Sequence, residues 1–135
     1  MTRSPPFPPA LETFADLFNR EAFWESHEVL EAPWRDGRSP FYHGLILVAS
    51  AFVHAQRHNL HGVRVQVAKA EQRLHDCRPA YLGVDVDALL AAAATVRDAV
   101  HAGLDPVFPR LVLRADLRRG DEREGLPLEP PPTRP

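Results

Sequence analysis

Hydrophobic residues recur every three to four positions over most of the chain, which is the period of an amphipathic α-helix. Five such segments are separated by short runs rich in proline, glycine, asparagine or aspartate. The expected helices span about residues 9–18, 21–35, 40–58, 60–77 and 86–101. The pattern predicts an all-α fold: a compact bundle of about five helices, built from two αα-hairpins plus a C-terminal helix.

Residues 40–58 are apolar almost all round, so this third helix is expected at the centre of the bundle. Asn19 and Asn59 are expected to cap the tight turns of the two hairpins. Asp85 is expected to cap the last helix, after a loop at residues 79–83. Pro33 is expected to kink or end the second helix in its last turn.

The two ends of the chain lack a helical pattern. Residues 1–8 are rich in proline and are expected to form a flexible arm before the helical bundle domain at residues 9–103. Residues 104–119 contain leucines with a period of two, which predicts an extended arm laid on the bundle or on a neighbouring subunit. Residues 120–135 carry charges and five prolines, which predicts a disordered tail.

The second helix carries ionisable residues on its apolar side. At about 100° per residue, six side chains fall within an arc of roughly 120°: Phe23, Trp24, His27, Leu30, Glu31 and Trp34. An ionisable group that faces the core must find a partner, because burying it unpaired is costly. This helix is therefore the candidate site. The candidate ligand-binding residues are Trp24, His27, Glu28, Glu31, Trp34 and, from the third helix, His54.

His27 and Glu31 are one helical turn apart, a spacing at which two side chains can share a proton or a metal ion. With His54 as a third ligand, the set would suit a divalent metal such as zinc or iron. The alternative is a buried His–Glu network, joined by the tryptophan N–H groups, that only holds the helices together. No phosphate loop, nucleophile elbow or other catalytic motif is found, so no catalytic residue and no enzyme activity are predicted.

Charge and composition bear on the partners and the location of the protein. The net charge of −2 gives no reason to expect nucleic acid. Residues 1–36 hold three bases and seven acids, whereas residues 37–82 hold six bases and two acids. The local charges of −4 and +4 would suit a homodimer or internal packing, but two solvated faces are the simpler interpretation. The single cysteine and the lack of a signal pattern predict a cytoplasmic protein. The longest apolar stretch, residues 44–53, is too short to cross a membrane.

An ordered series of short motifs runs through the helical part of the chain. It comprises Phe18-Asn19, His27-Glu28-Val29-Leu30-Glu31, Trp34, Phe41-Tyr42, Gly44-Leu45-Ile46, His54, Asn59, Gly62, Leu74 and Tyr81-Leu82-Gly83. Over about residues 11–100, this series resembles the bacterial and archaeal family called domain of unknown function 309. The resemblance implies a small all-helical fold and no established activity. The chain departs from the family pattern at Pro33, Leu47 and His58, the last of which stands where the family commonly has glycine.

Two hypotheses of function remain open at the level of sequence. The first is a non-catalytic structural or interaction module whose buried His–Glu network organises the core. The second is a bundle that binds a metal or small ligand through His27, Glu31 and His54, with metal-dependent hydrolysis as one use of such a site.

Overall fold

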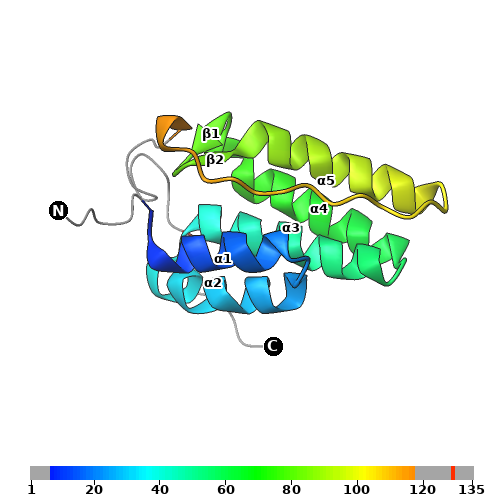
Figure 1. The fold of residues 1–135 in the computed structure, drawn as a ribbon, viewed down its shortest axis with the longest axis horizontal. Helices are drawn as coiled ribbons and strands as arrows, with labels where there is room; N and C mark the ends of the chain where they lie inside the picture. Colours follow the sequence, from blue (N-terminus) through cyan, green and yellow to red (C-terminus); the bar gives the residue numbers. More distant parts are fainter. Residues whose placement is uncertain (1–6, 118–128, 130–135) are drawn as a thin grey trace.

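The computed structural model describes residues 7–117 and residue 129. Five α-helices account for most of them: α1 (Pro9–Asn19), α2 (Phe23–Gly37), α3 (Pro40–Gln56), α4 (Leu60–Leu74) and α5 (Val86–His101). Shorter elements are the 3₁₀ turns η1 (His75–Cys77) and η2 (Ala115–Leu117) and the strands β1 (Ala80–Tyr81) and β2 (Val84–Asp85). The predicted all-α bundle of about five helices is confirmed (Figure 1).

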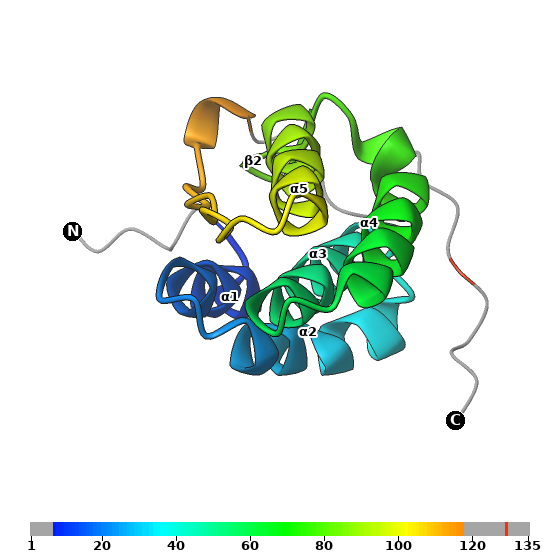
Figure 2. The ribbon, with the colours of Figure 1, turned by 90° about the vertical axis from the view of Figure 1, so that its right-hand side faces the viewer.

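Helix α3 lies at the centre, as its apolar sequence predicted. Seen along the helix axes, the other four helices are arranged around it (Figure 2). Twelve of its seventeen residues are buried, and they point in every direction around the helix. Ser39 caps its N-terminus by accepting a hydrogen bond from the backbone N–H of Tyr42 at 3.2 Å.

Phenylalanine rings join α1 and α2 to the central helix. The ring centroids of Phe18 in α1 and Phe23 in α2 are 5.0 Å apart, and that of Phe52 in α3 lies 5.2 Å from Phe23. Phe108, which follows α5, adds a fourth ring at 4.9 Å from Phe23. Aromatic pairs at these distances favour tilted or edge-on contacts, and all three pairs adopt them.

Helices α3 and α4 approach each other closely at a glycine. A Cβ atom added at Gly44 would lie 2.3 Å from Cγ of Leu74, so only a residue without a side chain fits there. At the other end of this hairpin, Asn59 caps α4 by accepting a hydrogen bond from the N–H of Gly62 at 3.1 Å. His58 precedes it with φ +52° and thus adopts the left-handed conformation that glycine tolerates best. Asp85 likewise caps α5, by accepting from the N–H of Ala88 at 2.9 Å. The predicted caps at Asn59 and Asp85 are confirmed.

The prediction that Pro33 ends α2 is wrong, because the helix continues through it to Gly37. Proline removes one backbone donor, but the following turn is closed by other means. Arg38 adopts the left-handed conformation, with φ +51°, and its N–H donates to the carbonyl of Trp34 at 2.6 Å. This is the usual way in which a helix ends, and it holds the last turn of α2 in place.

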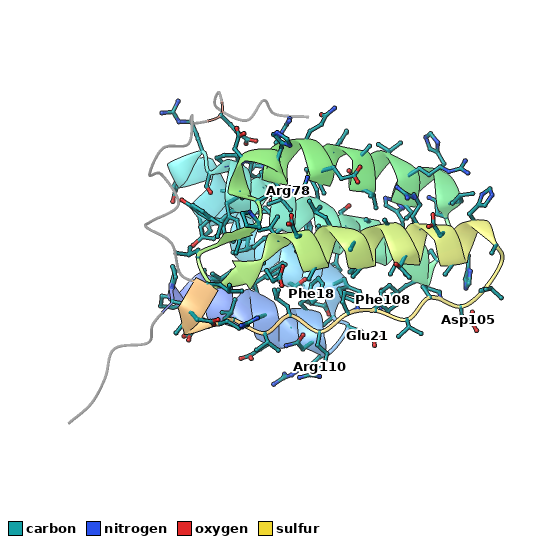
Figure 3. All side chains as sticks on the ribbon, turned by 90° about the horizontal axis from the view of Figure 1, so that it is seen from above. Phe18, Glu21, Arg78, Asp105, Phe108 and Arg110 are labelled. Carbon is teal, nitrogen blue, oxygen red and sulfur yellow. The ribbon has the colours of Figure 1, made fainter. Side chains whose placement is uncertain are left out.

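The prediction that Asn19 caps the first turn is also wrong. Its side-chain amide donates to the carbonyl of Leu111 at 2.9 Å and accepts from the N–H of Leu111 at 2.6 Å. Residues 104–114 have no regular secondary structure and run along α1 and α5 (Figures 1 and 3). Leu111 is buried among the helices. The extended arm predicted for this region therefore lies on the bundle of its own chain.

Residues 79–83, predicted as a loop, contain part of a small antiparallel hairpin in which Tyr81 pairs with Val84. Leu82 and Gly83 both have positive φ values, of 48° and 88°, as the two central residues of a tight hairpin turn require. Phe7 is buried and packs against Gly83, so the N-terminal arm predicted for residues 1–8 is anchored at its end. Residues 1–6 of that arm, and the tail predicted for residues 120–135 apart from residue 129, lie outside the described residues.

Within residues 7–117, none of the helices combines the length and apolar character needed to cross a membrane.

Replacing Gly44 with alanine should lower the free energy of unfolding by about 2 kcal/mol, because the new methyl group would overlap the side chain of Leu74. Gly103→Ala is the matched control. Gly103 has φ +75° but open space around it, so only backbone strain of about 1 kcal/mol is expected there. Urea denaturation measures the free energy of unfolding of both variants, and the Gly44→Ala protein should be the less stable. A Gly44→Ala protein as stable as Gly103→Ala would contradict the close packing of α3 on α4.

Replacing Asn19 with alanine should release the arm, because the backbone N–H and carbonyl of Leu111 would both lose their partner. We expect faster hydrogen exchange at the Leu111 amide and faster tryptic cleavage after Arg110 and Arg114. Thr13→Ala, at an exposed position on the same helix, should change neither rate. Unchanged exchange at Leu111 in the Asn19 variant would show that the arm is held by other contacts.

Candidate functional site

The buried face of α2 differs from the predicted arc. Its buried residues are Phe23, Ser26, Leu30 and Gly37. At 100° per residue, this stripe is rotated by roughly 70° from the arc expected from the sequence. Ser26 is fully buried, and its hydroxyl is satisfied there because it donates to the carbonyl of Phe23 at 2.8 Å. Trp24, predicted to face the core, is 55% exposed, and this prediction is wrong.

His27 and Glu31 do form a pair, at the rim of the core. Nε2 of His27 lies 3.1 Å from a carboxylate oxygen of Glu31, and the side chains are 17% and 36% exposed. Nδ1 of His27 lies 2.9 Å from the backbone carbonyl of Trp24. The Trp24 and His27 rings are in contact, with centroids 4.9 Å apart. Glu28 points to solvent. The His–Glu network predicted here is thus partly exposed.

His54 is placed apart from this pair. It lies near the end of α3, where its Nδ1 accepts a hydrogen bond from the side-chain amide of Asn59 at 3.2 Å. Its ring packs against Gly62, where an added Cβ would lie 2.4 Å from the ring. Among residues 7–117 and residue 129, no three His, Cys, Asp or Glu side chains are grouped so that they could hold a metal ion. The structure therefore does not assemble the three-ligand site predicted from His27, Glu31 and His54.

A second polar cluster lies at the other end of α2. The indole of Trp34 stacks on the imidazole of His43 from α3, with centroids 4.2 Å apart and an interplanar angle of 22°. Arg73 from α4 reaches the same place, with its Nε 3.2 Å from Nδ1 of His43. Three helices thus contribute one nitrogen-bearing side chain each. We call Trp34, His43 and Arg73 the carboxylate cradle, for the group that it holds.

The carboxylate of Glu129 lies in this cradle. Nε1 of Trp34 donates to Oε2 at 2.7 Å, and Nε of Arg73 lies 2.8 Å from Oε1. Nδ1 of His43 lies 2.8 and 2.9 Å from the two oxygens. A carboxylate only accepts hydrogen bonds, so Nδ1 must carry the hydrogen, and its 3.2 Å approach to Arg73 is then a contact rather than a hydrogen bond. The Glu129 side chain is only 15% exposed.

Arg35 connects the two polar clusters of α2. Its guanidinium lies 5.5 Å from the centroid of the Trp34 ring, and one of its nitrogens lies 3.7 Å from Glu31. A line of contacts therefore runs from His27 through Glu31 and Arg35 to the cradle. The cationic groups of Arg35 and Arg73 flank the indole and the imidazole, which makes the cradle suited to an anion.

This geometry can be compared with known proteins. Residues 11–65 match the model of the family described as Domain of unknown function (DUF309). The match confirms the resemblance over these residues, and the rest of the stretch to about residue 100 lies outside it. The DUF309 match covers nearly all of α1, all of α2 and α3, and the first residues of α4. It includes Trp34 and His43 of the cradle but not Arg73 or Glu129. No curated protein and no solved structure matches the chain.

Sequence reasoning found Trp34 but missed the other members of the cradle. His43 and Arg73 are not among the candidate residues of the sequence analysis, and Glu129 falls within the tail predicted for residues 120–135. One signal was available for His43. A short turn between the second and third helices brings the end of one close to the start of the other, and Trp34 and His43 flank that turn. No comparable signal links Glu129, which is 95 residues from Trp34.

Replacing His27 with alanine should lower the free energy of unfolding by only about 0.5 kcal/mol, since its ion pair with Glu31 is partly exposed and spans one helical turn. Glu28→Ala, at an exposed neighbouring position, is the control and should be close to neutral. Thermal and urea denaturation measure both. If the His27 variant lost 2 kcal/mol or more, the pair would contribute to holding the helices together.

Proposed function

We propose that the protein is a non-catalytic interaction module that binds another protein surface through the exposed face of α2. The observation that carries this proposal is the exposure of Trp24. Among residues 7–117, it is the only large hydrophobic residue on a helix that is counted as exposed; the others, Leu104, Val107 and Val112, lie in the arm. Tryptophan contributes more binding energy at protein interfaces than most residues.

The surroundings of Trp24 favour such a role. Its ring lies against His27, whose Nε2 is 3.1 Å from a carboxylate oxygen of Glu31 and whose Nδ1 is 2.9 Å from the backbone carbonyl of Trp24 itself. A side chain held in place before binding loses less conformational freedom when a partner arrives. In this proposal the pair His27–Glu31 positions the tryptophan and does no chemistry.

The partner proposed is a second copy of the chain. Glu25 and Glu28, both exposed, add negative charge beside Trp24, in keeping with the net charge of −4 over residues 1–36. Exposed basic residues on α4, Arg64 and Lys69, belong to the stretch with the opposite charge of +4. Such complementary surfaces attract each other, and salt weakens the attraction.

Sedimentation equilibrium tests this proposal. We expect a dimer at micromolar concentration in 50 mM salt, weaker association in 500 mM salt, and a dissociation constant raised about tenfold or more by Trp24→Ala. Val112→Ala, at an exposed apolar position of the arm, should leave the constant unchanged. A wild-type protein that stays monomeric at 100 micromolar, or a Trp24 variant that dimerises normally, would refute the proposal.

A further inference from the structure

We propose that the carboxylate cradle is a binding site for a glutamate side chain on a peptide segment, and that Glu129 is its intramolecular occupant. This inference concerns a different surface from the α2 contact of Trp24 and does not depend on it. It starts from the way in which the helices alone build the site.

The cradle is assembled without Glu129. Trp34, His43 and Arg73 all lie in the helical part of the chain, on α2, α3 and α4. Trp34 and His43 are held by stacking on each other, and both helices pack on the central core. Their relative placement therefore follows from the bundle, not from the residue that they bind.

Three nitrogen-bearing groups in this arrangement are matched to one carboxylate. The indole N–H and the imidazole Nδ1–H donate to the oxygens of Glu129 at distances of 2.7–2.9 Å, and Nε of the Arg73 guanidinium lies 2.8 Å from Oε1 as an ion pair. Hydrogen bonds to a charged acceptor are among the strongest in proteins. Without a carboxylate, the partly buried donors of Trp34 and His43 would lose their acceptor, so an empty cradle favours another anion of the same shape.

The contact to the backbone indicates a peptide. The N–H of Glu129 donates to the carbonyl of Arg38 at 3.0 Å, in the turn between α2 and α3. This hydrogen bond recognises a main chain next to the bound side chain. A small carboxylate such as glutarate can fill the three donors of the cradle, but it has no amide N–H to offer to Arg38.

Glu129 would then compete with any other glutamate. Because it belongs to the same chain, its local concentration at the cradle is high, and an external peptide must displace it. The affinity of the wild-type protein for such a peptide is therefore expected to be lower than the intrinsic affinity of the cradle.

The probe is a capped peptide with the sequence of residues 126–132, and the control peptide carries glutamine in place of its glutamate. Isothermal titration is done with the full chain carrying Glu129→Gln, and Trp34 fluorescence is followed in the same protein with Trp24→Phe. We expect the Glu129→Gln protein to bind the glutamate peptide at least tenfold more tightly than wild type does. The glutamine peptide should bind at least tenfold more weakly, since one strong hydrogen bond corresponds to about that factor.

Variants of the cradle complete the test. In the Glu129→Gln background, Arg73→Met keeps the apolar stem but removes the charge, and we expect at least a tenfold loss of peptide affinity. Arg97→Met on α5 is the control, since Arg97 contacts Asp98 and not the cradle, and it should have no effect. If Arg73→Met does not fold, as judged by circular dichroism, Trp34→Phe removes a donor while it keeps an aromatic ring, and the same loss is expected by titration.

Three outcomes would overturn the proposal. The first is a folded Glu129→Gln protein that binds neither peptide, which would make Glu129 a purely structural contact. The second is equal binding of the two peptides, or binding that does not depend on Arg73 or on the indole N–H of Trp34. The third is glutarate binding as tightly as the glutamate peptide, which would make the ligand a small carboxylate rather than a peptide.

Discussion

The burial of α3 on all sides is the constraint on which the rest of the structure depends. A helix with apolar residues in every direction is stable in water only when other elements cover it completely, and here four helices and the arm do so. Most polar groups then lie near its ends or on the surrounding helices, and Ser50, inside α3, accepts a hydrogen bond from the side-chain amide of Gln66 at 3.2 Å. His43, one turn into α3, is placed so that it meets Trp34 from α2 and Arg73 from α4. The cradle therefore forms near the end of the central helix, where its residues are no longer fully buried.

The sequence predicted those parts of the fold that depend on local patterns. The helices could be predicted because apolar residues recur every three to four positions along each of them. The caps at Asn59 and Asp85 could be predicted because a cap is a contact within one helical turn. Asn19 was misread because the same side chain serves equally well as a cap and as a clamp for a distant backbone, and its partner Leu111 is 92 residues away. The face of α2 was misread because Trp24 is apolar but exposed, whereas Ser26 is polar but buried with its hydroxyl bonded to the preceding turn.

The candidate site was predictable in part for the same reason. The pair of His27 and Glu31 follows from helical spacing, and the structure contains it. The cradle and the carboxylate that it holds bring together residues from four separate stretches, and the carboxylate comes from a region whose composition is typical of disorder. Neither periodicity nor composition carries information about such a contact, because Glu129 and Trp34 are 95 residues apart in the sequence. His58 shows the reverse case: the resemblance implies a glycine at this position, and the histidine that stands there adopts the left-handed conformation that glycine tolerates best.

The hairpin turn at Gly83 has a consequence for how the bundle opens. Phe7, near the start of the described chain, lies against this glycine, and the N–H of Gly83 donates to the carbonyl of Leu117 at 3.3 Å. The carbonyl of Gly83 in turn accepts from the N–H of Arg114 at 2.8 Å. Both ends of residues 7–117 are thus fastened to one small turn, although they are more than a hundred residues apart. Fraying at either terminus disturbs the anchor of the other, so the two ends of this domain are expected to detach together as one cooperative unit.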